Sequence, residues 1–216
     1  MSVQIGMRRL DRIVRWALTA SGAVVTLLLL AHLAFRADAD QADAEQYAVY
    51  SAYIEPGLAG ESHDLGSRTG LVVIDENSVF SNRFVQKSTL NQFRFLLGNA
   101  GHIKTAIPSL RRSALFELFF ANLRDERLER RLHLSTRYEL ATEQETNVYP
   151  SEQFMRRFPQ NYGYLTFSRV AFNRDLTEAF FYTEHVCGLC GEGRFVFVKK
   201  VNGFWIVDRI DSTWIS

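Results

Sequence analysis

The chain has 216 residues, 47% of them hydrophobic, and a formal net charge of +1 at pH 7. This length suits one domain with a short additional segment, and the apolar content excludes wholesale disorder. The first 36 residues hold five arginines and one aspartate, a net +4, so the remainder carries a net −3. A mildly acidic domain lacks the electrostatic footprint of a nucleic-acid binder, and we expect no nucleic-acid partner.

Residues 17–35 form an uncharged, apolar segment close to the roughly 20 residues that a helix needs to cross a bilayer. Arginines precede it and acidic residues follow it, so the positive-inside rule places residues 1–16 in the cytoplasm and exports the rest. Residues 36–45 are then a linker and 46–216 a periplasmic or extracellular domain. The expected localisation is a single pass through a bacterial inner membrane, which is also a membrane partner. The residues that characterise the predicted anchor are Ala17, Leu27, Leu28, Leu29, Leu30 and Phe35.

A cleaved signal peptide is the alternative for this segment. Ala37-Asp38-Ala39 resembles a small-residue cleavage site. The apolar segment is longer than the roughly 7 to 15 residues usual in signal peptides, which favours an uncleaved signal-anchor. Under either interpretation the domain is exported.

Helical patterns dominate the first half of the domain. The apolar residues from Tyr47 to Ile54 repeat at helical spacing, and Pro56 ends the pattern. Ser109, directly after Pro108, is the expected N-cap of a later helix. In chain order, we predict a loop, a buried strand and two further helices at residues 59–69, 71–74, 87–97 and 109–123.

Strand patterns dominate from residue 132 onward. A helix capped by Ser151 and stopped by Pro159 interrupts them, and Asn202-Gly203 is a strong signal for a hairpin. Helices first and an antiparallel meander later predict an α+β fold, with an NTF2-like cone as one possible form. The predicted strands lie at residues 132–140, 164–172, 177–186, 195–201 and 204–210.

The strand patterns also predict pairing. If residues 173–176 form a turn, Phe172 pairs with Thr177 and Tyr164 pairs with His185. Ser168 and His185 would then lie roughly 13 Å apart, too far for a nucleophile and its base. The last hairpin is apolar on both faces, so either helices cover both faces or one face receives a partner.

The second half of the chain contains the motifs PQNYGYLTFS, SRVAFN, CGLCGEG and a terminal WIS, and the first half contains YAVYSAYI. With these motifs the chain resembles a large family of uncharacterised bacterial exported proteins. Ala171 stands where that family often has glycine. The resemblance implies an exported domain and supplies no activity.

Cys187 and Cys190 are the only cysteines, in a glycine-rich loop between two strands. In an exported protein a local disulfide is the default expectation. A thiol-redox site is one alternative, although no helix N-terminus is present to lower the pKa of a thiol. A zinc site is another, with His185, Cys187 and Cys190 as ligands and Glu184 or Glu192 as a fourth.

The sequence therefore predicts function only as a class. The first hypothesis is a non-enzymatic module without a cofactor that binds a protein partner or a small ligand. The second is a thiol-redox or metal-binding protein centred on the CGLC loop. The third is an NTF2-like enzyme whose pocket holds a carboxylate with one of His63, His102 and His133.

Overall fold

We describe the protein from a computed structural model, which covers residues 41–56, 70–78, 80, 88–146, 151–161, 163–187 and 191–215. Met1–Ala44 and Glu45–Ser216 are separate units, and the second is the α+β domain. Its compact part thus begins one residue before the predicted domain start. The predicted loop at residues 59–69 lies outside the described residues.

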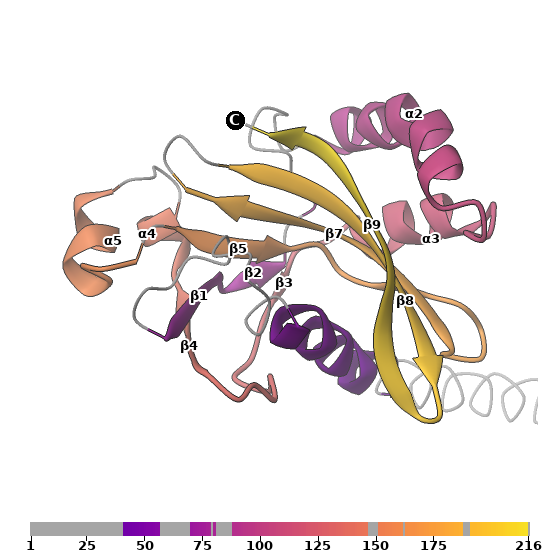
Figure 1. Cartoon of the computed structure of the whole chain (residues 1–216). Coiled ribbons are helices and arrows are strands. Elements are labelled where there is room, and N and C mark those ends of the chain that lie inside the picture. The colour runs from indigo at the N-terminus through magenta and orange to yellow at the C-terminus, as the bar shows by residue number, and fades with distance from the viewer. Residues whose placement is uncertain are drawn as a thin grey trace, which may run out of the picture. The chain divides into compact units, whose positions relative to one another are not determined.

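A mixed seven-stranded sheet forms the centre of the domain (Figure 1), in the order β4-β1-β5-β7-β8-β9, with β6 paired to β7. Strand β1 runs parallel to β4 and β5, and the remaining pairs are antiparallel. A separate short pair joins β2 (Asn77–Ser78) and β3 (Glu126–Arg127). The main strands are β1 (Leu71–Asp75), β4 (Arg137–Ala141), β5 (Tyr164–Phe167), β6 (Ala171–Phe172), β7 (Glu178–Val186), β8 (Glu192–Val201) and β9 (Phe204–Ile215).

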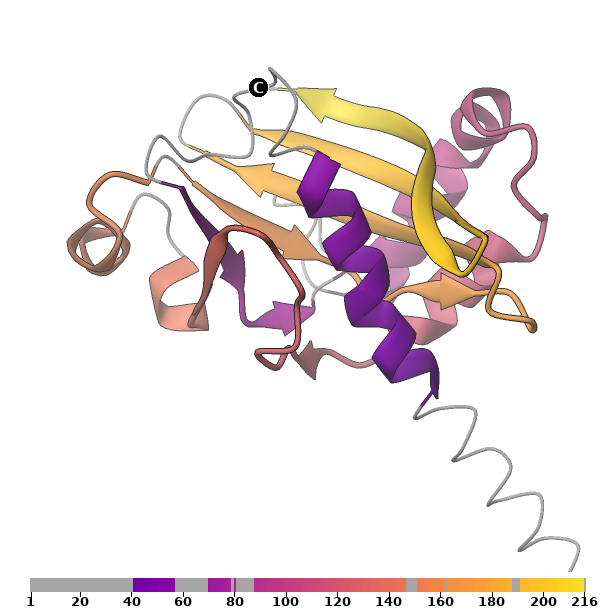
Figure 2. The same ribbon diagram turned by 60° about the horizontal axis from the view of Figure 1, so that its bottom comes forward.

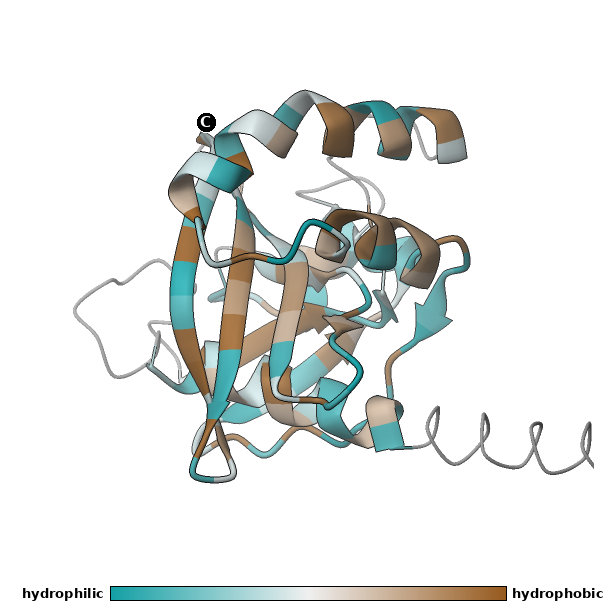
Figure 3. Cartoon of the chain, turned by 90° about the vertical axis from the view of Figure 1, so that its right-hand side faces the viewer, coloured by the Kyte–Doolittle hydropathy of each residue, from teal (hydrophilic) through white to brown (hydrophobic). Residues whose placement is uncertain are grey.

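Helices cover both faces of this sheet. Residues 41–56 are helical, and from Glu45 onward this segment crosses one face (Figure 2), where Tyr50 stacks on Phe167. Helices α2 (Thr89–Ala106) and α3 (Ala114–Ala121) pack on the other face. Figure 3 shows the apolar residues that recur along these two helices and along the long strands. The short helices α4 (Glu143–Thr146) and α5 (Glu152–Arg157) lie beside β1 and β4.

The central strands β7 and β8 are buried on both sides. Phe181 and Val196 pack toward the 41–56 helix, whereas Phe180 and Phe195 pack toward α2 and α3. For the last hairpin, the predicted cover by helices of the same chain on both faces is confirmed for β8. It is not confirmed for β9, where Ile206 and Ile210 are exposed together with Phe204 at the hairpin tip, which is 74% exposed.

Several local signals are confirmed. The predicted first helix and the strand at 71–74 are present. Ser151 caps α5, since its hydroxyl accepts a hydrogen bond from the backbone N–H of Phe154 at 2.9 Å. Asn202 and Gly203 both adopt positive φ angles, 52° and 86°, as a two-residue type I′ hairpin requires.

The predicted pairing of the first hairpin is wrong. Phe172 pairs with Ala179, and Leu165 rather than Tyr164 pairs with His185. Two side chains cause the difference. Asn173 Oδ1 accepts hydrogen bonds from the backbone of residues 177 and 178, which lengthens the turn. Ser168 Oγ accepts from the N–H of Tyr182, and the predicted single strand is interrupted there.

Two further predictions are corrected. The sheet is not a purely antiparallel meander, because β1 inserts between β4 and β5 in parallel. The helix expected from Ser109 begins only at Ala114, since Leu110 N–H and Ala114 N–H bond three residues back, to Ile107 and Arg111. The chain between α2 and α3 therefore makes tight turns before helix geometry begins.

The predicted transmembrane anchor, residues 17–35, lies outside the described residues. Among the helices that are described, none is both long and apolar enough to cross a membrane. The longest, α2, has 18 residues but includes polar and charged side chains such as Asn91, Arg94 and Lys104. The described helices thus give no support to the expected signal-anchor or to the single-pass inner-membrane localisation, and the fold class is corrected to an α+β domain with a mixed sheet.

Candidate functional site

The cysteine loop is described only in part. Cys187 is buried directly after β7, while Cys190 lies outside the described residues. No pair of described cysteines exists, so the predicted Cys187–Cys190 disulfide and the redox alternative both stay predictions. The Sγ atom of Cys187 lies 3.8 Å from Nδ1 of His185.

Among the described residues, no group of three or more metal-ligating side chains gathers. Both carboxylates proposed as a fourth zinc ligand have other partners. Glu184 accepts a hydrogen bond from the Tyr182 hydroxyl at 2.9 Å, and Glu192 pairs with Arg194 and Ser212. Burial tends to raise the pKa of Glu192, but the hydrogen bonds from Arg194 and Ser212, together with the positive charge of Arg194, outweigh this and lower it. Neither glutamate therefore supports the predicted zinc site as its fourth ligand.

A polar cluster on the α2 side of the sheet is fully packed. The Tyr182 hydroxyl donates to Glu184 and accepts from Trp214 Nε1 at 2.9 Å. Burial, together with the nearby Glu184 carboxylate, raises the pKa of Tyr182, which keeps this hydroxyl protonated. A Cβ on Gly193 would come within 2.2 Å of the Tyr182 hydroxyl, so the cluster leaves no space for a ligand.

The predicted histidines do not line the described pocket. His102 on α2 reaches β9, where its Nε2 lies 2.9 Å from Oδ1 of Asp211. His133 is exposed on a different segment, and His63 lies outside the described residues. The histidine-containing pocket expected of an NTF2-like enzyme is thus not found in the described part of the domain.

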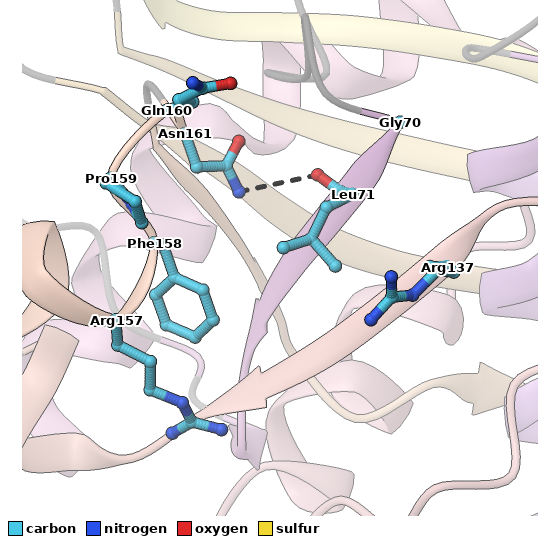
Figure 4. A pocket seen from close by; sticks show the side chains of 8 residues that line it. All are labelled: Gly70, Leu71, Arg137, Arg157, Phe158, Pro159, Gln160 and Asn161. Atoms are coloured by element: carbon cyan, nitrogen blue, oxygen red, sulfur yellow. Dashed lines mark hydrogen bonds between the residues drawn. The ribbon is translucent and has the colours of Figure 1, made fainter.

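A pocket of about 240 Å³ does open beside the parallel end of the sheet, where β1 and β4 begin (Figure 4). Leu71 and Arg137 form one side, and residues from the end of α5 form the other. The described residues that line it are Gly70, Leu71, Arg137, Arg157, Phe158, Pro159, Gln160 and Asn161.

The turn after α5 has a local origin in the sequence. The helix ends at Phe158 because Pro159 disfavours helical backbone in the residue before it. The backbone N–H of Asn161 then bonds to the carbonyl of Phe158 at 3.0 Å, and the Phe158 ring is buried. The Asn161 Nδ2 donates to the carbonyl of Leu71 at 3.4 Å, which ties the turn to β1.

Arg157, on one side of the pocket, is neutralised by two carboxylates. Its guanidinium donates to Glu145 at 2.9 and 3.0 Å and to Glu139 at 3.0 Å. Burial tends to raise the pKa of Glu145, but hydrogen bonds from Thr142 and Arg157 outweigh this and hold it below its usual value. Arg157 also lies 4.9 Å above the Phe158 ring, so it is fixed in position as well as neutralised.

Two polar groups of the pocket have no such partners. Arg137 pairs in register with Leu71 and is exposed, and its guanidinium makes no ion pair or hydrogen bond within the described part of the chain. Asn161 is only 4% exposed, yet its Oδ1 accepts no hydrogen bond from any described residue. The pocket thus combines an uncompensated cation with a buried, unused acceptor.

Sequence reasoning did not find this pocket. Its residues come from three separate segments that only the parallel pairing of β1 and β4 brings together. One local signal was available: Thr142-x-x-Glu145 is a capping box, in which Glu145 accepts from the N–H of Thr142 at 2.7 Å. It would have predicted α4 and the placement of Glu145, but not the pocket.

Comparison with known proteins adds no assignment: no protein-family model matches the chain, and neither the curated proteins nor the solved structures contain a significant match. The family resemblance inferred from the motifs therefore remains a prediction.

Proposed function

We propose that the domain is a small-ligand-binding module whose ligand occupies the pocket between β1, β4 and the turn after α5. The observation that carries this proposal is the pocket itself, where apolar surface lies beside the guanidinium of Arg137, which has no ion-pair or hydrogen-bond partner among the described residues. A guanidinium binds a carboxylate or phosphate through parallel hydrogen bonds, so a ligand in the pocket would supply the missing partner.

Binding fits the lining better than catalysis does. Among the described lining residues, the ionisable side chains are Arg137 and Arg157, and these residues include no serine, cysteine, histidine or carboxylate. General acid–base and nucleophilic chemistry usually depend on those groups. Apolar surface from Leu71, Phe158 and Pro159, combined with a few polar atoms, is the usual composition of a ligand site.

The test is a fragment screen on the full-length chain, read by the backbone amide shifts of the lining residues in NMR spectra. Gln160→Trp places an indole at the exposed rim of the pocket, and Gln92→Trp on α2 is the matched control. We expect fragments that shift Leu71 and Asn161 to bind the control as they bind the wild type. Their affinity for Gln160→Trp should fall at least tenfold.

A screen in which no fragment shifts the lining amides would overturn the proposal. Equal binding to Gln160→Trp and Gln92→Trp would do the same, because it would place the fragments elsewhere on the domain.

A further inference from the structure

We propose that the outer surface of α2 and α3 docks an acidic amphipathic helix of a partner protein. The surface is an apolar band that continues from one helix to the other, and none of its residues lines the pocket. The band consists of Leu90, Phe93 and Leu97 on α2, Phe116, Phe119 and Phe120 on α3, and Leu123 just beyond the end of α3. Its exposure, the spacing of its residues and the charge around it support this partner.

The band is exposed although its side chains are large and apolar. Five of them are between 47% and 64% exposed: Leu90, Leu97, Phe116, Phe120 and Leu123. Phe93 and Phe119 are half-buried, and their ring centroids lie 5.3 Å apart, which joins the two helices into one band (Figure 3). Single exposed apolar residues are common on protein surfaces, but contiguous ones mark an interaction site.

The spacing along each helix suits a rod-shaped partner. The members of the band lie three, four and seven residues apart, so they share one side of their helix. Each stripe is therefore about 10 Å long, since a helix rises ~1.5 Å per residue. Two to three turns of a partner helix cover that length. Apolar anchors at this same spacing are the usual means by which an amphipathic helix binds a protein surface.

The charge around the band requires an acidic partner. Residues 88–125 hold five basic and two acidic residues, a net +3, whereas residues 37–216 as a whole carry a net −3. Arg111 is paired with Glu117 and Glu178. The other four basic side chains are exposed and form no ion pair within the described part of the chain: Arg94, Lys104, Arg112 and Arg124. Acidic residues beside the apolar stripe of a partner would complement them, whereas two copies of this chain meeting through the band would bring like charges together.

The composition of the band favours a protein helix over an anionic lipid surface. Protein segments at a membrane interface are enriched in tryptophan and tyrosine, and residues 88–125 contain neither. A bilayer also imposes no helical spacing on the residues that contact it, whereas both stripes of the band have that spacing.

The experiment titrates the full-length chain with two matched 14-residue peptides, followed by backbone amide shifts in NMR spectra. The acidic peptide is Ac-LEQLAEQLEQLAEQ-NH2, which has leucines at helical spacing. The basic peptide replaces every glutamate of this sequence by lysine. We expect the acidic peptide to shift the amides of α2 and α3 and to bind at least fivefold more tightly than the basic one. Added salt should reduce its affinity.

Substitutions then test the apolar part of the band. Leu97→Glu and Phe120→Glu should each weaken the acidic peptide at least tenfold, because each places a negative charge within the band. Phe204→Glu is the matched control, since Phe204 is also a large exposed apolar residue but lies outside the band, at the tip of the β8–β9 hairpin. It should leave the affinity unchanged. Melting temperatures check that each variant is folded, and either band variant suffices for the test.

A charge reversal tests the basic residues beside the band. Arg124→Glu should weaken the acidic peptide and strengthen the basic peptide, each several-fold. Arg130→Glu is the control, because Arg130 is equally an exposed arginine but follows Leu128, which packs with the 41–56 helix on the other face of the sheet. It should change neither affinity by more than about twofold, since exposed charges at a distance are screened by salt.

Equal affinities for the two peptides, or no shift of the α2 and α3 amides, would overturn the proposal. Binding to phosphatidylglycerol vesicles that Phe120→Glu abolishes, without peptide binding, would identify a lipid surface and overturn the protein partner. A dimer in sedimentation velocity that Phe120→Glu dissociates would identify a second copy and overturn it as well. The pocket is tested separately, because its fragments are followed at Leu71 and Asn161.

Discussion

The centre of the sheet and its parallel end differ in whether their polar groups have hydrogen-bond partners within the protein. In the centre, the Tyr50 hydroxyl donates to the Ser168 carbonyl at 2.7 Å, and Ser168 Oγ accepts from the N–H of Tyr182. At the parallel end, Arg137 and Asn161 Oδ1 line a pocket without protein partners in the described chain. The contrast separates polar groups that hold the fold together from polar groups that are available to a ligand.

This difference follows from how the two regions are built. Strands β7 and β8 are covered on both faces, so a polar atom there cannot form a hydrogen bond with water. Its hydrogen-bond partner must come from the protein. At the parallel end, one face packs against the 41–56 helix, while the described residues that cover the other face belong to α5 and the following turn, beside which the pocket opens. The centre should therefore be sensitive to packing, and the parallel end to charge.

The largest effect is expected in the centre. Phe181→Ala removes a fully buried ring that contacts both Tyr50 and Tyr53, and should lower the free energy of unfolding by roughly 3 to 5 kcal/mol. Phe204→Ala, at the exposed hairpin tip, is the matched control and should change it by no more than about 0.5 kcal/mol. Urea denaturation followed by circular dichroism measures both. Similar losses for the two variants would mean that the centre is not the main source of stability.

An intermediate effect is expected where the two regions meet. A Cβ on Gly163 would lie 2.2 Å from the carbonyl oxygen of Val186. This oxygen belongs to the backbone and cannot move away by a side-chain rotation. Gly163→Ala should therefore destabilise the domain by roughly 1 to 3 kcal/mol, through overpacking between β5 and β7.

The control for this glycine is Gly98→Ala in α2, where a Cβ meets nothing within 4 Å. It should stabilise the domain by up to about 1 kcal/mol, because alanine favours helix. Melting temperatures that shift in the same direction for both variants would contradict the close approach at Gly163.

Sequence reasoning succeeded where structure depends on neighbouring residues. The Ser151 cap, the Asn202-Gly203 turn and, within the last hairpin, the two-sided burial of β8 all follow from local patterns. It failed where a side chain replaced a backbone partner, as Ser168 and Asn173 do around β6.

Long-range pairing was the other failure, and the pocket depends on it. Nothing in the LVVI pattern indicates that β1 lies in parallel between β4 and β5, and this pairing sets Leu71 beside Arg137. The candidate residues chosen from the sequence were the cysteines and histidines, because these residue types often take part in redox, metal-binding or catalytic sites. The pocket is instead lined by an arginine side chain and an asparagine Oδ1 that have no partner among the described residues, which only a structure can reveal.

The smallest effect concerns the charge balance at the parallel end, and it depends on pH. Glu145 has a pKa below its ordinary value because hydrogen bonds from Thr142 and Arg157 outweigh its burial. A carboxyl with a lowered folded-state pKa contributes stability above its unfolded pKa, near 4.5, and loses that contribution as the pH falls through the folded value. Glu145→Gln should therefore cost about 1 to 2 kcal/mol at pH 7, and the cost should shrink as the pH falls through the folded-state pKa and the wild-type carboxyl becomes protonated.

Glu152→Gln is the matched control, since its ion pair with Arg156 is exposed on the surface of α5. It should leave stability nearly unchanged at both pH values, because exposed pairs contribute little. Denaturant midpoints of the wild type and both variants at pH 7 and pH 3 measure these changes in stability. A loss of stability for Glu145→Gln that persisted at low pH would show that Glu145 acts through packing and not through its charge. Arg157 would then no longer count as a neutralised cation, and Arg137 would no longer be the one cation that the proposal leaves for the ligand.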